Sequence, residues 1–315
     1  MNIGIDMMGG DYAPLEVVKG INQYLSDRVN DTVHFTLFGD PERIQSGLAQ
    51  YPVPETRITL VPASQVIGMH EHPTKALKEK PDSSIAIGFK YLASGQTDAF
   101  VSAGNTGAML VGTMFSIKAV EGVLRPTISS FIPIQNGGTG LLLDVGLNSD
   151  CKPEQLNQFA IIGSLYSKYM LGVENPKTGL LNIGEEEGKG NILMQATYPL
   201  LKENPSINFI GNIEGRDAFT DKADVMVCDG FTGNIVLKLA ESLYDIAINE
   251  SIDNQYFNRF NFELYGGTPV LGVEKPVIIG HGISHAIAFS NMIDMAVKML
   301  DTDVLGKIKA ALAEQ

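Results

Sequence analysis

Residues 99–108, AFVSAGNTGA, join a short apolar run to a polar cluster that contains glycine, and this combination decides the fold. The run 99–101 predicts a strand, and the cluster after it predicts a tight turn that leads into a helix. The same order recurs along the chain, which predicts an α/β protein with an open, mostly parallel sheet. Six further clusters, most of them after an apolar run, are 6–11 (DMMGGD), 144–148 (DVGLN), 182–190 (NIGEEEGKG), 211–217 (GNIEGRD), 229–234 (DGFTGN) and 280–284 (GHGIS).

These clusters also predict a ligand site. In an open parallel sheet the carboxyl ends of the strands face a common crevice where ligands bind. Glycine lets the backbone approach a ligand closely, and the free N–H groups of the following helix attract anions. The polar residues of the clusters are mostly Asn, Asp, Glu, Ser and Thr, with few cations. The pattern therefore indicates a site for a small phosphate-like ligand and not a site built around a covalent nucleophile.

The composition excludes several classes of protein. The net charge of −13 over 315 residues disfavours nucleic-acid binding, which needs a basic surface. Two cysteines, Cys151 and Cys228, form no disulfide framework and suit a reducing cytosol. The amino terminus, MNIGIDMMGG, predicts a first strand instead of a signal peptide, and no run is apolar for long enough to span a bilayer. We therefore expect a cytoplasmic protein.

The apolar pattern predicts individual elements of the sheet. Residues 141–145 are nearly all apolar, as expected of a central strand that is covered on both faces. Residues 233–250 predict a helix whose core stripe is Ile235, Leu239, Leu243 and Ile246. No linker, repeat or low-complexity tract divides the chain, so we expect a single domain over residues 1–315, made of two packed lobes whose boundaries the sequence does not fix.

Two nucleotide-binding motifs fail on their spacing. A P-loop needs four residues between its first glycine and the Gly-Lys pair, followed by Ser or Thr. Only three residues separate Gly184 from Gly188, and Gly190 follows Lys189. The segment 138–140, GTG, lacks the third glycine of a dinucleotide fingerprint and precedes a strand. We therefore expect no cofactor.

Three other motifs have simple structural interpretations. Ser284 lies in half of a nucleophile elbow whose second glycine is replaced by Ala286, and an N-cap is the better interpretation. His70 and His72 lack the helical spacing of a zinc site and indicate a solvated loop, so we expect no metal. Cys228 has no histidine nearby in sequence and indicates a buried structural thiol.

Charged residues in the clusters allow two interpretations. Cations that follow parallel strands in an acidic chain favour anion binding, although each one can also be an ordinary solvated side chain. The aspartates can bind a ligand or serve as turn and cap residues. The cations are Lys189, Arg216 and Lys238, and the aspartates are Asp6, Asp11, Asp144 and Asp229.

The segment 256–265, YFNRFNFELY, is rich in aromatic residues. One interpretation is a helix that is buried or lies at a dimer interface. The other is an apolar patch or hairpin that touches lipid or receives an acyl chain, with Phe257, Phe260 and Phe262 as its contacts. The sequence leaves both open.

Taken together, the motifs resemble those of the phosphate acyltransferase family of bacterial phospholipid synthesis. The resemblance covers residues 1–297, and the sequence differs from the usual family pattern at Thr268, Ile283 and His285. It implies a doubly wound α/β/α fold like that of phosphotransacetylases and of isocitrate and isopropylmalate dehydrogenases. Its motifs are DMMGGDYAP, VSAGNTGAML, LLLDVGLN, LLNIGEEEGKG, IGNIEGRD, VCDGFTGNIVLK and VIIGHGISHA.

The resemblance implies transfer of a long-chain acyl group from acyl–acyl carrier protein to inorganic phosphate. The acyl phosphate would feed a membrane glycerol-3-phosphate acyltransferase, and the enzyme would be a homodimer bound peripherally to the membrane. Phosphate itself can attack the thioester, so the protein has to position it and stabilise the oxyanion. Three alternatives remain open: a phosphotransacetylase-like enzyme that uses short acyl-coenzyme A, a decarboxylating dehydrogenase and a non-enzymatic membrane scaffold.

Candidate roles follow from this resemblance and from the clusters. We expect His281 to donate to the oxyanion or the leaving thiol, and Asp229 to orient His281 or the phosphate. Lys189 is a further catalytic candidate. Candidate phosphate or substrate ligands are Asp6, Asp11, Ser102, Asn105, Thr106, Arg216, Asn234 and Lys238. Candidate contacts for the acidic carrier protein are Lys75, Lys78, Lys80 and Lys90.

Overall fold

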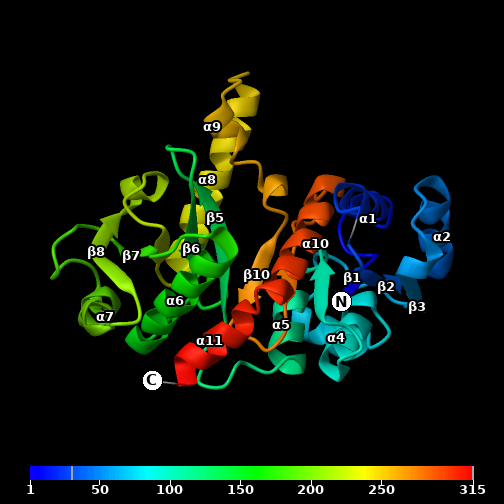
Figure 1. Ribbon diagram of the computed structural model, residues 1–315, viewed down its shortest axis with the longest axis horizontal. Helices are drawn as coiled ribbons and strands as arrows, with labels where there is room; N and C mark the ends of the chain where they lie inside the picture. Colours follow the sequence, from blue (N-terminus) through cyan, green and yellow to red (C-terminus); the bar gives the residue numbers. More distant parts are fainter. Residues whose placement is uncertain (30, 314–315) are drawn as a thin grey trace. The chain divides into compact units, whose positions relative to one another are not determined.

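The computed structural model describes residues 1–29 and 31–313, which fall into two compact units. The first unit comprises Met1–Ala119 and Phe262–Asp301, and the second comprises Val120–Asn261 and Thr302–Gln315. The strands of each unit run mostly parallel, and each unit has its own helices (Figure 1). The prediction of a mostly parallel α/β protein is therefore confirmed.

The first unit has strands in the order β3-β2-β1-β4-β11-β10. All neighbours are parallel except β10 and β11, which run antiparallel. The central strand β1 pairs Ile5 with Leu37 of β2 and with Val101 of β4. The strands are β1 (Asn2–Asp6), β2 (His34–Gly39), β3 (Ile58–Pro62), β4 (Ala99–Ser102), β10 (Thr268–Leu271) and β11 (Val277–Ile279).

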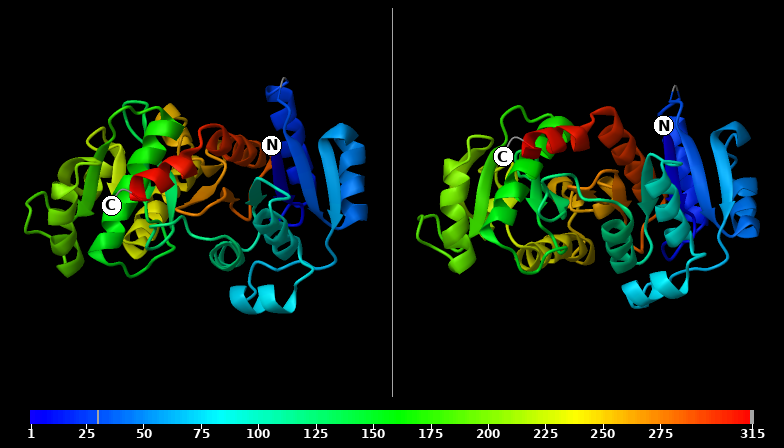
Figure 2. Two further views of the ribbon diagram at one scale, coloured as in Figure 1. Left: turned by 60° about the horizontal axis from the view of Figure 1, so that its bottom comes forward. Right: turned by 90° about the horizontal axis from the view of Figure 1, so that it is seen from below.

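Helices cover both faces of this sheet. Figure 2 shows α10 and α4 on opposite faces, and α10 packs along α1. On the α4 face, Gly88 lets the helix approach closely, because a Cβ there would lie 2.3 Å from the ring of Phe100. The helices are α1 (Leu15–Asp27), α2 (Pro41–Gln50), α3 (Pro73–Glu79), α4 (Ser84–Ser94), α5 (Thr106–Ser116) and α10 (Ala286–Asp301).

The second unit has strands in the order β5-β6-β9-β7-β8, and only β5 runs antiparallel to its neighbour. Leu141, Leu142 and Leu143 of β6 are fully buried, as predicted for a central strand. The strands are β5 (Thr127–Pro133), β6 (Thr139–Leu143), β7 (Lys177–Asn182), β8 (Asn208–Glu214) and β9 (Val225–Val227).

In the second unit, α6 packs against α7 and α11, whereas α8 contacts β5 and β6. No helix within residues 1–29 and 31–313 has the length and apolar character needed to cross a bilayer. The helices of this unit are α6 (Pro153–Tyr166) with its π-helical extension Ser167–Leu171, α7 (Ile192–Glu203), α8 (Gly230–Asn249), α9 (Gln255–Asn258) and α11 (Val304–Ala313). Short 3-10 turns lie at Glu55–Arg57, Gly215–Phe219 and Phe262–Leu264.

The predicted core stripe of α8 is wrong. Ile235, Leu239 and Ile246 are 52%, 66% and 53% exposed, and Leu243 is half-buried. The buried residues of α8 are instead small, Gly230, Gly233, Ala240 and Ala247. Small residues let α8 approach the sheet closely, so its large aliphatic side chains face away from the unit's core.

Candidate active site

A buried carboxylate organises the polar cluster of the first unit. Asp6 ends β1 and is fully buried, and the Ser102 hydroxyl at the end of β4 donates a 2.6 Å hydrogen bond to it. The Met8 N–H donates another at 3.0 Å. Burial raises the pKa of Asp6, while these donors act in the opposite direction. A Cβ on Gly9 would lie 2.4 Å from the Asp6 carboxylate, so only glycine fits there.

Asn105 joins α5 to the loop 68–72. Its Oδ1 accepts from the Ala108 N–H at 2.9 Å and caps the helix. Its Nδ2 lies 2.9–3.1 Å from the carbonyl oxygens of Gly68, Met69 and Glu71 and donates to them. Ser102 and Asn105 are thus buried and engaged within the protein. We therefore revise the expectation that their side chains bind phosphate directly: they position the loops.

Three other candidates of the first unit remain accessible. Thr106 is exposed at the first turn of α5, and Asp11 is exposed while its N–H donates to the Gly282 carbonyl at 2.7 Å. His281 is half-buried after β11, with its ring 4.4 Å from that of Phe262. The loops after β1, β4 and β11 thus meet at one end of the sheet, as predicted for strand carboxyl ends.

Ser284 does not cap the helix that follows it. The hydroxyl is buried without a hydrogen-bond partner, and α10 begins at Ala286. Instead, the Ala286 N–H donates to Glu16 at 2.9 Å, and the His285 N–H donates to Glu263 at 2.8 Å. Carboxylates from elsewhere in the unit therefore stabilise this helix N-terminus, where negative charge is favourable.

A second buried carboxylate organises the polar cluster of the second unit. Asp144 follows β6 and accepts hydrogen bonds from the N–H groups of Gly146, Leu147 and Asn148 and from the Asn148 side chain, at 2.6–3.0 Å. Burial raises the pKa of Asp144, and the donors offset part of this effect. A Cβ on Gly233 would lie 1.9 Å from the Asp144 carbonyl, so glycine is required where α8 meets this loop.

Asp229 and Asn234 have structural partners at the start of α8. Asp229 is 7% exposed and caps the helix by accepting from the N–H and the hydroxyl of Thr232, at 2.9 and 2.8 Å. Asn234 donates to the Val145 carbonyl at 3.0 Å. Asp229 belongs to the second unit and His281 to the first, so the expectation that one orients the other stays a prediction.

The acidic loop 184–190 is held by ion pairs. Glu185 pairs with Lys222 at 2.6 Å, and Glu187 pairs with Lys202 at 2.6 Å. Lys189 lies 3.8 Å from Glu186 on its own loop, and Arg216 pairs with Glu214. The side chains of Lys189 and Arg216 are nevertheless 50% and 78% exposed, which leaves both cations accessible to an anion. Lys238 is exposed on α8.

The aromatic segment is only partly accessible. Phe260 is 6% exposed and packs edge-on against Phe219 and Tyr256. It therefore belongs to the core of the second unit, which corrects its expected role in lipid or acyl contact. Phe257 is half-buried, and Phe262 packs on His281.

Sequence reasoning missed two asparagines that connect the loops of the second unit. Asn182 donates to the Lys189 carbonyl and to the Asn212 side chain, both at 3.1 Å. Asn212 in turn donates to the Glu186 carbonyl at 2.9 Å. Both residues lie inside glycine-containing clusters, and this position was the one feature of the sequence that could have indicated their role.

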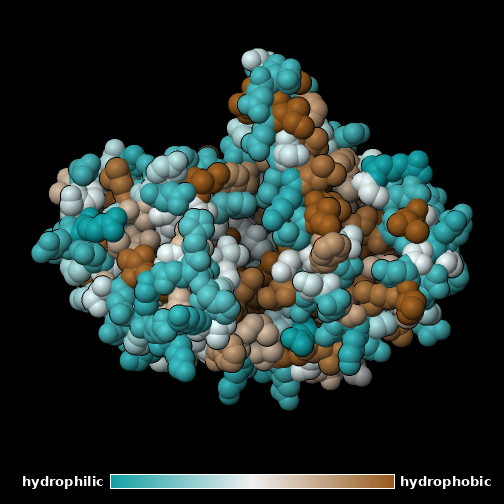
Figure 3. Space-filling model, turned by 180° about the vertical axis from the view of Figure 1, so that it is seen from behind, coloured by the Kyte–Doolittle hydropathy of each residue, from teal (hydrophilic) through white to brown (hydrophobic). Residues whose placement is uncertain are grey.

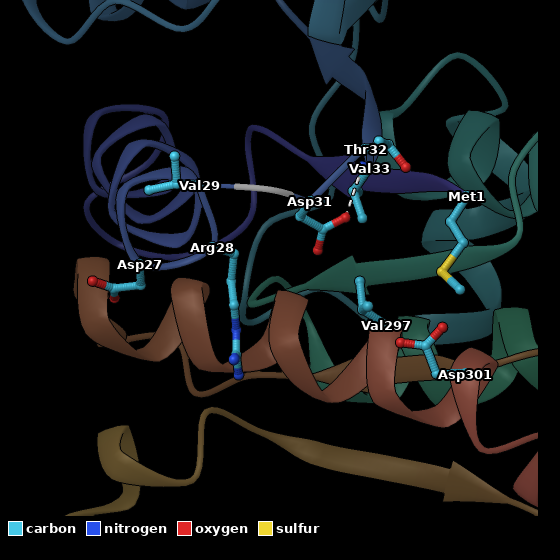
Figure 4. Close-up of a pocket in the computed structure, with 9 residues that line it drawn as sticks. All are labelled: Met1, Asp27, Arg28, Val29, Asp31, Thr32, Val33, Val297 and Asp301. Atoms are coloured by element: carbon cyan, nitrogen blue, oxygen red, sulfur yellow. Dashed lines mark hydrogen bonds between the residues drawn. The ribbon is translucent and has the colours of Figure 1, made fainter.

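A hollow of the first unit lies at the opposite end of its strands. It measures about 460 Å³ and is lined by Met1, Arg28, Asp31 and Val33, among others (Figure 4). The hollow lies beside the start of β1 and β2, whereas ligands of α/β proteins bind at the carboxyl ends of the strands. We therefore do not include it in the candidate site.

Over the described part of the chain, no three His, Cys, Asp or Glu side chains are grouped to hold a metal ion.

Comparisons with known proteins identify relatives of nearly full length. The model of the family described as "Fatty acid synthesis protein" matches residues 1–307. The "Phosphate acyltransferase" of Dictyoglomus turgidum is 43% identical, with 99% of this chain and 98% of the relative covered. The "Phosphate acyltransferase" of Halothermothrix orenii is 42% identical, with 98% of each chain covered.

Two solved structures have folds similar to that of this chain. A phosphotransacetylase from Streptococcus pyogenes superposes with a TM-score of 0.66 at 16% identity, covering 95% of this chain and 93% of that chain. The EutD phosphotransacetylase from Staphylococcus aureus gives a TM-score of 0.62 at 15% identity, covering 95% and 94%. The predicted likeness to the phosphotransacetylase fold is therefore confirmed.

The double role of Asn105 generates a prediction. In Asn105→Asp the carboxylate keeps the cap of α5 but faces three carbonyl oxygens without a donor. We expect the free energy of unfolding to fall by about 1–3 kcal/mol, and hydrogen exchange at residues 69–72 to accelerate. Asn191→Asp is the control, because Asn191 caps α7 through the same contact with the Met194 N–H. Equal stability losses in the two variants would refute the anchoring role.

Proposed function

This chain belongs to the fatty acid synthesis protein family, and we propose that it is a phosphate acyltransferase, as its curated relatives are named. The observation that carries this proposal is identity of 42–43% over nearly the whole length of both chains. We further propose that the acyl group is long-chain, that its donor is acyl–acyl carrier protein and that its acceptor is inorganic phosphate. The product is an acyl phosphate that supplies phospholipid synthesis through a membrane glycerol-3-phosphate acyltransferase.

The reaction needs no nucleophile from the protein. A phosphate oxygen attacks the thioester carbonyl carbon, a C–O bond forms and the C–S bond breaks. The sulfur leaves as a thiolate and takes up a proton. The protein then contributes by positioning phosphate and by stabilising the oxyanion, and the second contribution is commonly worth about 3–4 kcal/mol per donor.

In the first unit, phosphate is held at the amino-terminal end of α5. The exposed Thr106 lies there, and free N–H groups of a first helical turn bind anions. Ser102, Asn105 and Asp6 support this loop from within the protein. His281 donates to the oxyanion or to the leaving sulfur, and Asp11 contacts substrate beside it.

In the second unit, Lys189, Arg216 and Lys238 neutralise negative charge on phosphate or on the phosphopantetheine arm of the carrier. Their exposure supports this role. Asp229 and Asn234 fix the start of α8, the helix that carries Lys238.

The carrier protein itself is acidic and binds Lys75, Lys78 and Lys90 on α3 and α4 of the first unit. Lys80 forms an ion pair with Glu71 at 2.5 Å and donates to the Val66 carbonyl at 2.8 Å. Because these partners already hold its ammonium group, Lys80 is the weakest of the four candidates for binding the carrier protein.

The apolar face of α8 supports a homodimer. Phe231, Ile235, Leu239 and Ile246 lie on one side of this helix and are all more than half exposed. A contiguous apolar surface of this kind is typical of an interface between subunits. A second copy of the same helix would cover it with matching chemistry.

Peripheral membrane contact is proposed for the segment that follows this face. Ile248 and Ile252 are 56% and 44% exposed. Figure 3 shows hydrophobic side chains gathered on the part of the surface that carries the end of α8 and α9, at the top of the view. Aliphatic side chains at such a tip insert at the lipid interface. Ile248 and Ile252 replace Phe260 in this role.

The reaction is tested by phosphate-dependent thiol release from palmitoyl–acyl carrier protein, beside acetyl-coenzyme A. Rapid release from the carrier substrate supports the proposal, release from acetyl-coenzyme A alone favours a short-chain phosphotransacetylase, and absence of release favours a scaffold. In the active enzyme, His281→Ala should lower kcat by about 100-fold, because a positioned proton donor contributes this much. His34→Ala, at the opposite end of the sheet, is the control. A loss below about three-fold in His281→Ala would remove His281 from the mechanism.

The dimer is tested by Leu239→Glu, which places a charge in the middle of the exposed apolar face of α8. We expect the sedimentation coefficient to change from that of a dimer to that of a monomer, because an unpaired charge is costly to bury. Ala310→Glu adds the same charge at an exposed position of α11 and should leave the dimer intact. A dimer that survives Leu239→Glu would assign the interface elsewhere.

Membrane contact is tested by flotation of the double variant Ile248→Ser and Ile252→Ser with phospholipid vesicles. We expect most of the protein to leave the vesicle fraction, with little dependence on salt, because the contact is apolar. Val29→Ser, which changes another exposed aliphatic residue, is the control. Unchanged flotation of the double variant would contradict the proposed contact.

A further inference from the structure

The second unit contains a cavity that is open to solvent and whose lining residues have no role in the proposed function. It measures about 340 Å³, a space that on the order of ten water molecules would occupy. It lies where β7 and β8 end and where α7 and α8 begin. The cavity is lined by Leu181, Asn182, Ile183, Gly190, Asn191, Met194, Gly215, Thr232 and Val236. A space of this size exceeds an ordinary packing defect and is suited to part of a ligand.

The wall of this cavity is mainly apolar. Leu181, Met194 and Val236 contribute aliphatic or thioether side chains from β7, α7 and α8. Ile183, which also lines the cavity, is 81% exposed. Such a wall favours a hydrocarbon over a phosphate or a sugar.

Exposed apolar side chains continue from the cavity to the surface. Ile192 is 88% exposed and follows Asn191 of the wall, and Ile183 of the wall is itself largely exposed. Contiguous exposed apolar side chains mark binding surfaces, whereas single ones scattered over a surface need no explanation. An extended alkyl chain can therefore follow apolar contacts from the surface into the cavity.

Polar side chains also line the cavity, and two cations lie next to lining residues in the sequence. Asn191 and Thr232 belong to the first turns of α7 and α8, where N–H groups favour negative charge. Lys189 and Arg216 are the sequence neighbours of Gly190 and Gly215 in the wall, and both are at least half exposed. Lys189 pairs with Glu186, and Arg216 pairs with Glu214. An apolar wall beside polar helix N-termini suits a molecule that has a hydrocarbon tail and a polar thioester head.

We infer that this cavity holds the alkyl chain of the long-chain acyl group. The inference rests on the proposed function and adds to it the subsite that selects chain length. Because a short acyl group leaves the cavity empty, filling the cavity should penalise long acyl donors and spare short ones.

The test narrows the cavity from two sides. Val236→Phe enlarges a half-buried side chain of the wall, and Gly215→Leu adds one where a Cβ meets no atom within 4 Å. Gly188→Leu is the matched control, because a Cβ there also meets no atom within 4 Å and Gly188 does not line the cavity. The readouts are kcat/KM for palmitoyl and butyryl thioesters of one carrier protein, and binding of pyrene-labelled hexadecanoate by fluorescence.

We expect Val236→Phe and Gly215→Leu to lower kcat/KM for the palmitoyl donor at least ten-fold, to change the butyryl value less than two-fold, and to weaken binding of the labelled fatty acid. The butyryl activity shows that each variant is folded. Equal losses for both donors would assign the cavity to the pantetheine arm and overturn the inference, as would an unchanged chain-length profile. Failure of the proposed function is recognised separately, as absence of thiol release in the unchanged enzyme, and labelled hexadecanoate then still tests the cavity.

Discussion

Each unit depends on one buried carboxylate at the end of a central strand. Asp6 collects donors from the loops after β1 and β4, and Asp144 collects four donors from the loop after β6. Burying a carboxylate is costly unless donors replace water, so these loops have little conformational freedom once the aspartate is in place. The fixed loops in turn determine where α5 and α8 begin, and therefore where their free N–H groups lie.

This construction separates residues that shape the site from residues that can meet a ligand. Ser102, Asn105 and Asp229 are buried and bonded within the protein, whereas Thr106, Lys189 and Arg216 reach solvent. The buried residues give a rigid frame, and the accessible ones are short or flexible groups at its edge. Rigid support of this kind is what transfer between two substrates requires, because positioning supplies much of the rate.

The sequence was sufficient for the fold class because apolar runs and glycine turns act locally. It also located the clusters that carry the polar side chains. It did not separate Ser102 and Asn105 from true ligands, since the same short polar groups serve as caps and as ligands. The stripe of Ile235 and Leu239 was wrongly assigned to the core, because periodicity identifies an apolar face but not what covers it. Phe260 is buried because it packs against Phe219. The two residues are far apart in the sequence, so a local pattern does not reveal this contact.

The order in which the chain is made has a consequence for the first unit, whose parts are Met1–Ala119 and Phe262–Asp301. Residues Val17, Val18 and Ile21 of α1 are fully buried, and α10 is the helix packed along α1. During synthesis, on the order of ten seconds or more separates these segments, and until then β4 has no β11 beside it. An open strand edge and a bare helix face in a nascent chain attract chaperones. The unit whose first strands leave the ribosome first is therefore completed only after most of the second unit has been made.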